Sequence, residues 1–562
     1  MVYTFKFGGF KLTRFKARMV LAAWGLTRGV DYSESYTGTA PASDLKDLEC
    51  IAVERGWIIT EMDAKQAYTN SKMPPQPNGQ PVTARLPAGI RIFNDTDATP
   101  TQPTIPFNAP GYDAATPALT FTNDIDSSLL GLHISEVGCV VIRAIYGHPS
   151  AGFAWSKDLS TTLTNQNPDR TPCPLTIVQC VSQPSIYYVK FPDAEVDRTC
   201  IIWINNDNIR LYVSHWDTHV TFATWIRTVY DMTGGHESLQ SLGTSTCFGI
   251  DFTYTDGQTR LDMIPYATKL LTTYGMEHCN KVDTPLPTKF SLCKDDCPTT
   301  PEAQQLVADG VRKLFPLQNV DTYADARTVY RQATMAVNWF ATMIAPIIKV
   351  GVSILGRVMI NPPLVAFKAL KRLLRFIKGE MALGLTYRKT RDWAHDEYPQ
   401  LEYHSDASFA DDIDSAKTQG GFCANFPGQP VSTFVSRLSS RVLVSTFDSE
   451  YYYGYLAALD IIYKRQLFTE LRFMLTGPTK LHIDNQATVL LAGSPIRKFS
   501  QQSKHFRVAE RLLEEQVDEG NIAIIDVDGK NHVADALTKP LPAHDVTRYN
   551  HVFHGTQYGF RA

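Results

Sequence analysis

The sequence predicts a multidomain protein that combines α+β and α/β architecture. Its 562 residues exceed what one hydrophobic core normally serves, so three or four domains are expected. Residues 198–204 and 209–216 are β-rich runs separated by an Asn-Asn-Asp-Asn tetrapeptide, which is typical of a hairpin turn. Residues 366–378 instead place apolar side chains at the spacing of an amphipathic helix. The mixture of both patterns along the chain predicts the mixed fold class.

Composition narrows the functional classes. Hydrophobic residues make up 44% of the chain and charged residues 20%, as in a folded globular protein rather than a disordered one. The formal net charge of −3 gives no overall basic surface that would attract nucleic acid. Any nucleic-acid binding must therefore use local basic patches together with bound metal ions.

The cysteine pattern and the apolar segments indicate an intracellular protein without a membrane partner. The ten cysteines are scattered, and no second close pair completes a zinc-site pattern, which favours reduced thiols. The N-terminal residues are basic and interrupted by Gly8 and Gly9, unlike a signal peptide. The most apolar run, residues 335–348, is too short to span a bilayer, so we expect a buried helix there.

Three polar segments that contain proline divide the chain. Residues 74–117 are expected to form a long irregular insertion, because prolines recur there among Asn, Gly, Thr and Asp. Residues 283–325 and 388–400 are expected to be connectors, and the second of them precedes a strand-like segment.

Two carboxylates in the N-terminal half are candidates for polymerase chemistry. Asp63 ends a β-like run and is followed five residues later by Tyr68, while the hairpin turn contains Asp207. Template-directed polymerases use carboxylates on adjacent strands to hold two divalent ions, one at the primer hydroxyl and one at the triphosphate.

Four further acids lie in the C-terminal third, each on its own predicted element. They are, in order, Asp406, Glu450, Asp484 and Asp535. A cluster of carboxylates can hold two Mg²⁺ ions about 4 Å apart on a scissile phosphate. Their spacing is sufficient to cross a sheet and return through a helix, so we expect the four acids to meet and to bind metal.

An ordered series of motifs along almost the whole chain resembles the copia-type retrotransposon Pol polyproteins. FKARMVLAAWGLTRGVDYSESY resembles the fingers signature of that family, and AIYGHPSAGFAW and YATKLLTTYGMEHCNKVDTPLP resemble later polymerase motifs. YHSDASFADD, STFDSEYYYGYLAAL, LHIDNQATVLLA and ADALTKPLP resemble the strings that contain the family's ribonuclease H (RNase H) acids.

The resemblance implies a domain order and an activity. We expect a right-hand polymerase with fingers, palm and thumb in residues 1–282, a connection in 283–394, and an RNase H-like domain with a mixed sheet in 395–562. The implied activity is RNA-directed DNA synthesis with cleavage of the RNA of RNA–DNA hybrids, using Mg²⁺ or Mn²⁺ in two-metal sites. The implied catalytic metal ligands are Asp63, Asp207, Asp406, Glu450, Asp484 and Asp535.

The polymerase motifs depart from the family pattern, which has a Tyr-x-Asp-Asp box at the hairpin turn. Aligning residues 203–206 with the box removes both aspartates, whereas aligning residues 205–208 retains Asp207 and replaces the second aspartate by Asn208. We prefer the second alignment, because a hydrophobic–basic–hydrophobic run then follows. Elsewhere Ser150 replaces a glutamine near the incoming nucleotide, and Tyr68 matches the aromatic residue that excludes a 2′ hydroxyl. The predicted nucleotide-binding residues are Tyr68, Ser150 and Asn208.

Two further features leave a functional and a structural interpretation open. The basic face of helix 366–378 is either a phosphate track or a solvated surface, and its residues are Lys368, Lys371, Arg372, Arg375 and Lys378. His532 lies three residues before Asp535, and either assists proton transfer or is a solvated loop histidine.

Two functions therefore remain open. The first is a reverse transcriptase with RNase H in a cytoplasmic particle or the nucleus, whose partners are an RNA template, a DNA primer and an RNA–DNA hybrid. The second is a domesticated or decaying remnant with an inactive polymerase, which binds nucleic acid or scaffolds element or host proteins. Asn208 favours the second function for the polymerase half, and the four C-terminal acids favour the first for the nuclease half.

Overall fold

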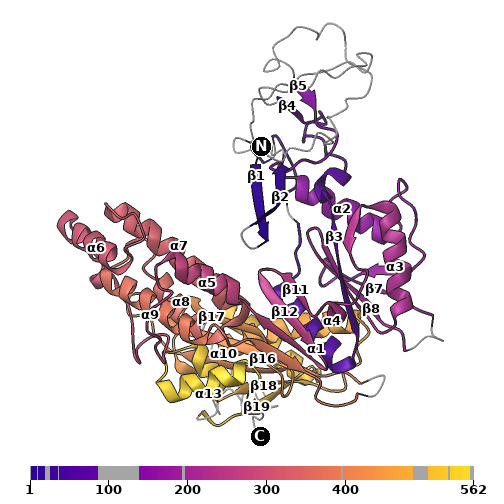
Figure 1. Cartoon of the computed structure of the whole chain (residues 1–562). Helices are drawn as coiled ribbons and strands as arrows, with labels where there is room; N and C mark the ends of the chain where they lie inside the picture. The colour runs from indigo at the N-terminus through magenta and orange to yellow at the C-terminus, as the bar shows by residue number, and fades with distance from the viewer. Residues whose placement is uncertain are drawn as a thin grey trace, which may run out of the picture. The chain divides into compact units, whose positions relative to one another are not determined.

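Figure 1 shows the computed structural model of the chain. The structure describes residues 2–8, 11–18, 26–28, 30–35, 37–85, 138–192, 197–393, 397–484, 504–529 and 532–556. Most of the predicted 74–117 insertion lies outside the described residues. The chain divides into two compact units, Met1–Gly38 with Ala64–Pro172, and Thr39–Asp63 with Cys173–Ala562.

The first unit contains, among its described residues, two antiparallel strand pairs and one long helix. Strand β1 (Val2–Gly8) pairs with β2 (Lys11–Arg18), and β4 (Thr83–Arg85) pairs with β5 (Gly138–Val140). Helix α2 (Ala151–Leu163) packs against the 3₁₀ helix η1 (Ala67–Asn70).

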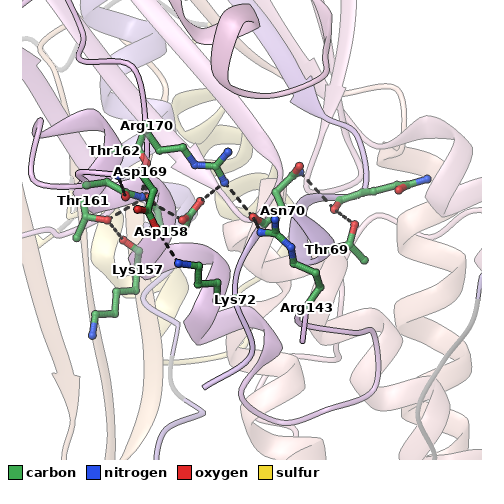
Figure 2. Close-up of polar contacts among 12 residues, drawn as sticks. Thr69, Asn70, Lys72, Arg143, Lys157, Asp158, Thr161, Thr162, Asp169 and Arg170 are labelled. Carbon is green, nitrogen blue, oxygen red and sulfur yellow. Dashed lines mark hydrogen bonds and ion pairs between the residues drawn. The ribbon is translucent and has the colours of Figure 1, made fainter. Parts of the chain in front are cut away.

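Polar contacts hold η1 in place beside α2, as Figure 2 shows. The Asn70 carbonyl oxygen accepts hydrogen bonds from Arg143 Nη1 and Arg170 Nη2, each at 2.9 Å. Arg170 also forms a partly buried ion pair of 3.2 Å with Asp158 of α2. One arginine thus joins the end of η1 to the helix.

The second unit contains three larger sheets in the part of the chain that the structure describes. Sheet A has the strand order β10-β3-β9-β8-β7-β6. The bounds are β10 (Met232–Gly234), β3 (Ile58–Ala64), β9 (Asn208–Val213), β8 (Cys200–Asn205), β7 (Ile186–Val189) and β6 (Ile177–Gln179). Helices α1 (Ala42–Arg55), α3 (Trp216–Val229) and α4 (Leu239–Leu242) are its helical neighbours in the sequence.

The predicted hairpin turn is present between β8 and β9. Asn205 pairs with Asn208 across it, so Asn206 and Asp207 form a two-residue loop. Asn206 has a φ of 54°, a left-handed conformation that asparagine tolerates better than most residues. All of β8 is buried, which matches the apolar run of residues 200–204.

Sheet B, with the order β11-β12-β13-β14, joins distant parts of the chain. Its strands are β11 (Thr244–Cys247), β12 (Ile250–Thr255), β13 (Gln258–Asp262) and β14 (Leu385–Arg388). Between β13 and β14 lie α5 (Ile264–Thr273), η5 (Lys294–Asp296), α6 (Pro301–Leu314), α7 (Tyr323–Ile344), η6 (Pro346–Ile348), α8 (Lys349–Gly356) and α9 (Leu364–Glu380). The predicted amphipathic helix is α9.

The apolar run of residues 335–348 forms the end of α7 and η6, where most of its residues are buried. In the described ranges, no helix combines the length and the apolar character needed to cross a membrane.

Sheet C is the mixed five-stranded sheet expected near the C-terminus, with the order β17-β16-β15-β18-β19. The pairs β17–β16 and β16–β15 are antiparallel, whereas β15–β18 and β18–β19 are parallel. The strands are β15 (Glu402–Ser408), β16 (Lys417–Asn425), β17 (Val431–Val442), β18 (Thr479–Ile483) and β19 (Ile522–Asp526). The helices are α10 (Thr446–Glu470), α12 (Lys504–Asp518), η8 (Val533–Leu537) and α13 (Ala543–Phe553).

Helix α1 is packed against sheet C as well as against sheet B. Its buried acids Asp44 and Asp47 both bind the Lys464 ammonium of α10, at 2.6 and 2.5 Å. Its buried Glu54 accepts hydrogen bonds from Thr390 and the Trp393 indole. The predicted 395–562 region therefore shares a continuous core with residues that come much earlier in the chain.

Candidate metal centre

The four C-terminal acids converge at one edge of sheet C. Strand β15 contributes Asp406, the beginning of α10 contributes Glu450, Asp484 directly follows β18, and η8 contributes Asp535. Neighbouring parallel strands β15 and β18 place their acids at the same sheet end, because both strands run in the same direction. The structure thus brings together the predicted acids from four separate elements.

Burial and mutual repulsion raise the pKa values of two of these acids. Burial, with the charges of Asp406 and Asp484, raises the pKa of Glu450 to about 10. Burial and the neighbouring Asp406 raise the pKa of Asp535 to about 6. At neutral pH Glu450 is therefore protonated, and the four carboxyl groups are not all ionised at the same time.

Two side chains from the segment after Asp535 contact the acids. Lys539 Nζ lies 2.7 Å from Asp535 Oδ1, and the Thr538 hydroxyl donates a hydrogen bond to Asp406 Oδ2. Our sequence reasoning did not identify either residue. The available signal was the spacing of four between Asp535 and Lys539, which brings the two side chains together on a helical turn.

The cluster fits divalent cations. Glu450 Oε2 is buried and has no hydrogen-bond partner in the part of the chain that the structure describes. A buried carboxylate oxygen without a partner is costly, and a cation would supply one while also lowering the repulsion among the acids. Carboxylate oxygens are the ligands that Mg²⁺ and Mn²⁺ prefer.

His532 belongs to this cluster and is not a solvated loop histidine. Its side chain is fully buried, and its Nδ1 atom lies 3.9 Å from Asp484 Oδ2. The proximity of His532 lowers the pKa of Asp484. Ligand atoms of Asp406, Asp484 and His532 all lie within 4.8 Å of one another.

Asp63 and the predicted turn are neighbours in sheet A. Across the antiparallel β3–β9 pair, Asp63 lies directly opposite Asn208. Asp207 is in the two-residue loop, adjacent to Asn208. Trp203, by contrast, is an inner residue of β8 with no exposed surface. This geometry favours the alignment that sets residues 205–208 against the family box.

The other two predicted nucleotide-binding residues lie in the first unit. The Tyr68 ring packs on Tyr146, with 4.8 Å between the ring centroids. Ser150 is only 3% exposed and directly precedes helix α2. The nucleotide roles of Tyr68 and Ser150 remain predictions.

Three of the five basic side chains of α9 that were predicted to bind phosphate donate hydrogen bonds within the protein instead. Lys371 donates to the Leu314 carbonyl at 2.8 Å, and Arg375 donates to the Asn280 carbonyl at 2.7 Å. Arg372 donates to the Thr284 hydroxyl at 2.6 Å. Lys368 is exposed and Lys378 half-buried, so these two fit the predicted role best.

No family model matches the chain. It is similar to retrovirus-related Pol polyproteins from plant transposons, among them that of transposon TNT 1-94 from Nicotiana tabacum, with 20% identity over 537 residues. This match covers 96% of the chain and 34% of the relative. The Pol polyproteins of transposons RE1 and RE2 from Arabidopsis thaliana are each 23% identical, over 94% and 96% of this chain and 30% of each relative.

The chain is a distant homologue of copia-type retrotransposon Pol polyproteins. It spans about a third of the length of these curated relatives. Among solved structures, two foamy viral protease-reverse transcriptases in complex with double-stranded DNA are similar at 11% and 9% identity, with TM-scores of 0.16 and 0.17. The matches cover 84% and 87% of this chain, and 69% and 62% of those chains.

Proposed function

We propose that this chain is the reverse transcriptase and RNase H portion of a copia-type Pol polyprotein. We further propose that the four acids at sheet C cleave the RNA strand of an RNA–DNA hybrid with the help of divalent cations. The observation that carries the proposal is the convergence of Asp406, Glu450, Asp484 and Asp535 from four elements. Burial and the neighbouring charges raise the pKa of Glu450 to about 10, and a buried cluster of acids is costly to the fold, which favours a functional reason for the cluster.

The residues of the chain have distinct roles in this mechanism. Asp406 and Asp484 provide carboxylates on adjacent strands, and Glu450 loses its proton when a divalent cation offsets the repulsion. Divalent cations in such a site activate water and stabilise the leaving oxygen of a phosphodiester. Lys539 lies 2.7 Å from Asp535 and adds a positive charge to the cluster, which can attract a phosphodiester.

The test is cleavage of a labelled RNA–DNA hybrid by the full chain with Mg²⁺ or Mn²⁺. Asp484→Asn removes a charge that the other acids need to hold the cations, so we expect loss of cleavage by at least about a hundredfold. The matched control is Asp526→Asn, because Asp526 is an exposed aspartate at the same end of the neighbouring strand β19. Unchanged cleavage by the Asp484→Asn protein would refute the nuclease assignment.

The hairpin in sheet A supports a second activity, RNA-directed DNA synthesis. Asp63 and Asp207 offer two carboxylates, and Asn208 offers a neutral oxygen directly opposite Asp63. We infer weak polymerase activity that depends on Mn²⁺, since one negative charge near two dications is missing. The alternative is a polymerase-shaped protein that only binds nucleic acid or scaffolds partners, and incorporation on a primed RNA template separates the two.

The proposed partners follow from these activities. They are an RNA template, a DNA primer and an RNA–DNA hybrid, met in a cytoplasmic particle or in the nucleus. Particle fractionation that places the protein with element RNA would support this, and recovery of the protein without any RNA would oppose it.

A further inference from the structure

The buried histidine beside the acids lacks the contacts that usually explain such a residue. His532 has no exposed surface, and neither ring nitrogen has a hydrogen-bond partner among the described residues. A buried imidazole loses its bonds to water, and a structural histidine normally recovers them from a carbonyl or a carboxylate. The Asp484 carboxylate lies 3.9 Å from His532 Nδ1, which is beyond hydrogen-bond distance.

Two other histidines lie nearby but are not in the group of possible metal ligands. His404 and His482 stack on each other, with 4.4 Å between ring centroids and 12° between ring planes. Within the described residues, the group whose ligand atoms lie within 4.8 Å of one another consists of Asp406, Asp484 and His532.

We propose that His532 is a direct ligand of one divalent cation, together with Asp406 and Asp484. The inference rests on the proposed nuclease centre and adds a nitrogen ligand to its oxygen ligands. A cation about 2.1 Å from each atom can join two ligand atoms up to about 4.2 Å apart, and the 3.9 Å between His532 Nδ1 and Asp484 Oδ2 is within that limit. The three ligand atoms lie within 4.8 Å of one another, so a side-chain movement of less than about 1 Å brings any remaining pair within the same limit.

A nitrogen ligand changes which cation this subsite prefers. Mg²⁺ binds oxygen ligands almost exclusively, whereas Mn²⁺ and later transition metals also accept imidazole, with higher affinity for nitrogen-containing sites. The subsite therefore prefers Mn²⁺ to Mg²⁺, and the preference depends on the His532 ring.

The experiment measures metal binding by the full chain, without a reaction. Mn²⁺ is titrated into EDTA-stripped protein and followed by electron paramagnetic resonance, with Mg²⁺ as competitor, and pulsed spectra report ¹⁴N modulation from a bound imidazole. We expect the wild-type protein to show the modulation. His532→Gln should abolish it and weaken Mn²⁺ binding by about tenfold or more, while Mg²⁺ binding changes by less than about threefold.

The matched control is His482→Gln, which alters a neighbouring histidine outside the ligand group and should retain the modulation. Circular dichroism and the thermal midpoint of each variant establish that it is folded. Bound Mn²⁺ without ¹⁴N modulation in the wild type, or equal weakening of Mn²⁺ and Mg²⁺ by His532→Gln, would overturn the inference. No Mn²⁺ binding by folded wild-type protein would also overturn it.

Hybrid cleavage measured in parallel separates this inference from the proposed function. If the wild type cleaves the hybrid, Asp484→Asn does not, and the wild type gives no nitrogen signal, then the nuclease assignment stands and His532 is not a metal ligand. If the wild type gives a nitrogen signal that His532→Gln abolishes, but does not cleave the hybrid, then the metal site stands and the nuclease assignment is rejected.

Discussion

Asn208 differs from an aspartate by an amide nitrogen in place of one carboxylate oxygen. It begins strand β9, opposite both Asn205 in β8 and Asp63 in β3. The backbone around it is an ordinary two-residue hairpin that depends on Asn206 for its positive φ. At position 208, this hairpin therefore differs from one with two adjacent aspartates only in the charge of the side chain.

Restoring that charge should strengthen the proposed polymerase. We expect Asn208→Asp to raise deoxynucleotide incorporation with Mn²⁺ by about tenfold or more, because an anionic oxygen binds dications better than an amide oxygen. The measurement is primer extension on an RNA template. Asn206→Asp adds the same charge to the loop position and serves as control. An unchanged rate in the folded Asn208→Asp protein would favour the inactive alternative.

At the scale of elements, helix α1 is the junction of the second unit. Buried charges on its different faces bind different partners: Glu49 binds Arg210 of β9 at 2.6 Å, and Asp44 and Asp47 bind Lys464 of α10. A buried ion pair adds little stability relative to apolar residues, but loss of one partner leaves an uncompensated charge in the core. The helix thus joins sheet A to sheet C through buried ion pairs. Removal of either charge of such a pair is expected to destabilise the fold.

This junction predicts a large effect from one substitution. Lys464→Met should lower the free energy of unfolding by about 3–5 kcal/mol, because Asp44 and Asp47 would remain buried without a cation. Lys480→Met is the control, since Lys480 forms an exposed pair with Glu402 and should contribute about 1 kcal/mol or less. Urea unfolding measures both. Similar effects of the two substitutions would show that α1 does not depend on Lys464.

The same contacts bear on whether the nuclease region could fold by itself. An isolated 395–562 fragment would lack α1, so Lys464 would lose both of its partners. The packing therefore does not favour a stable fragment, and the nuclease test is best made with the full chain.

At the scale of the whole molecule, the second unit joins the last of the described helices to the middle of the chain. Helix α13 contacts η6, and His554 at its C-terminal end is buried, with Nδ1 at 2.7 Å from the Asn550 carbonyl oxygen. Burial lowers the pKa of His554 to about 4. This position makes the stability of the unit dependent on pH.

The sign of that dependence follows from proton uptake. The unfolded chain, with a histidine pKa near 6.5, binds a proton between pH 6.5 and 4 that the folded chain does not bind. The contribution of His554 to stability is therefore complete above pH 6.5 and decreases as the pH falls toward 4, by about 3 kcal/mol.

Denaturation at several pH values measures this effect. The folded His554→Gln variant should lose less stability than the wild type between pH 6.5 and 4. His544→Gln, which alters an exposed histidine of the same helix, should follow the wild type. Identical pH profiles for the His554→Gln and wild-type proteins would contradict the prediction.

Features that depend on local chemistry were predictable from the sequence. The turn at residues 205–208 follows from the preference of asparagine for positive φ, and α9 follows from its apolar spacing. The mixed architecture of sheet C and the order of its four acids followed from the resemblance to the copia-type family, because its motifs keep their order along the chain.

Features that depend on burial were decided only by the tertiary structure. The sequence of the basic face of α9 does not show whether its side chains bind phosphate or carbonyl groups of the protein. In the structure, Lys371 and Arg375 bind carbonyl groups. The sequence left His532 open as a proton-transfer residue or a solvated loop histidine, and the structure buries it beside Asp484. The surroundings of these side chains are set by segments about 50 to 100 residues away in the sequence, and local periodicity contains no information about which segments those are.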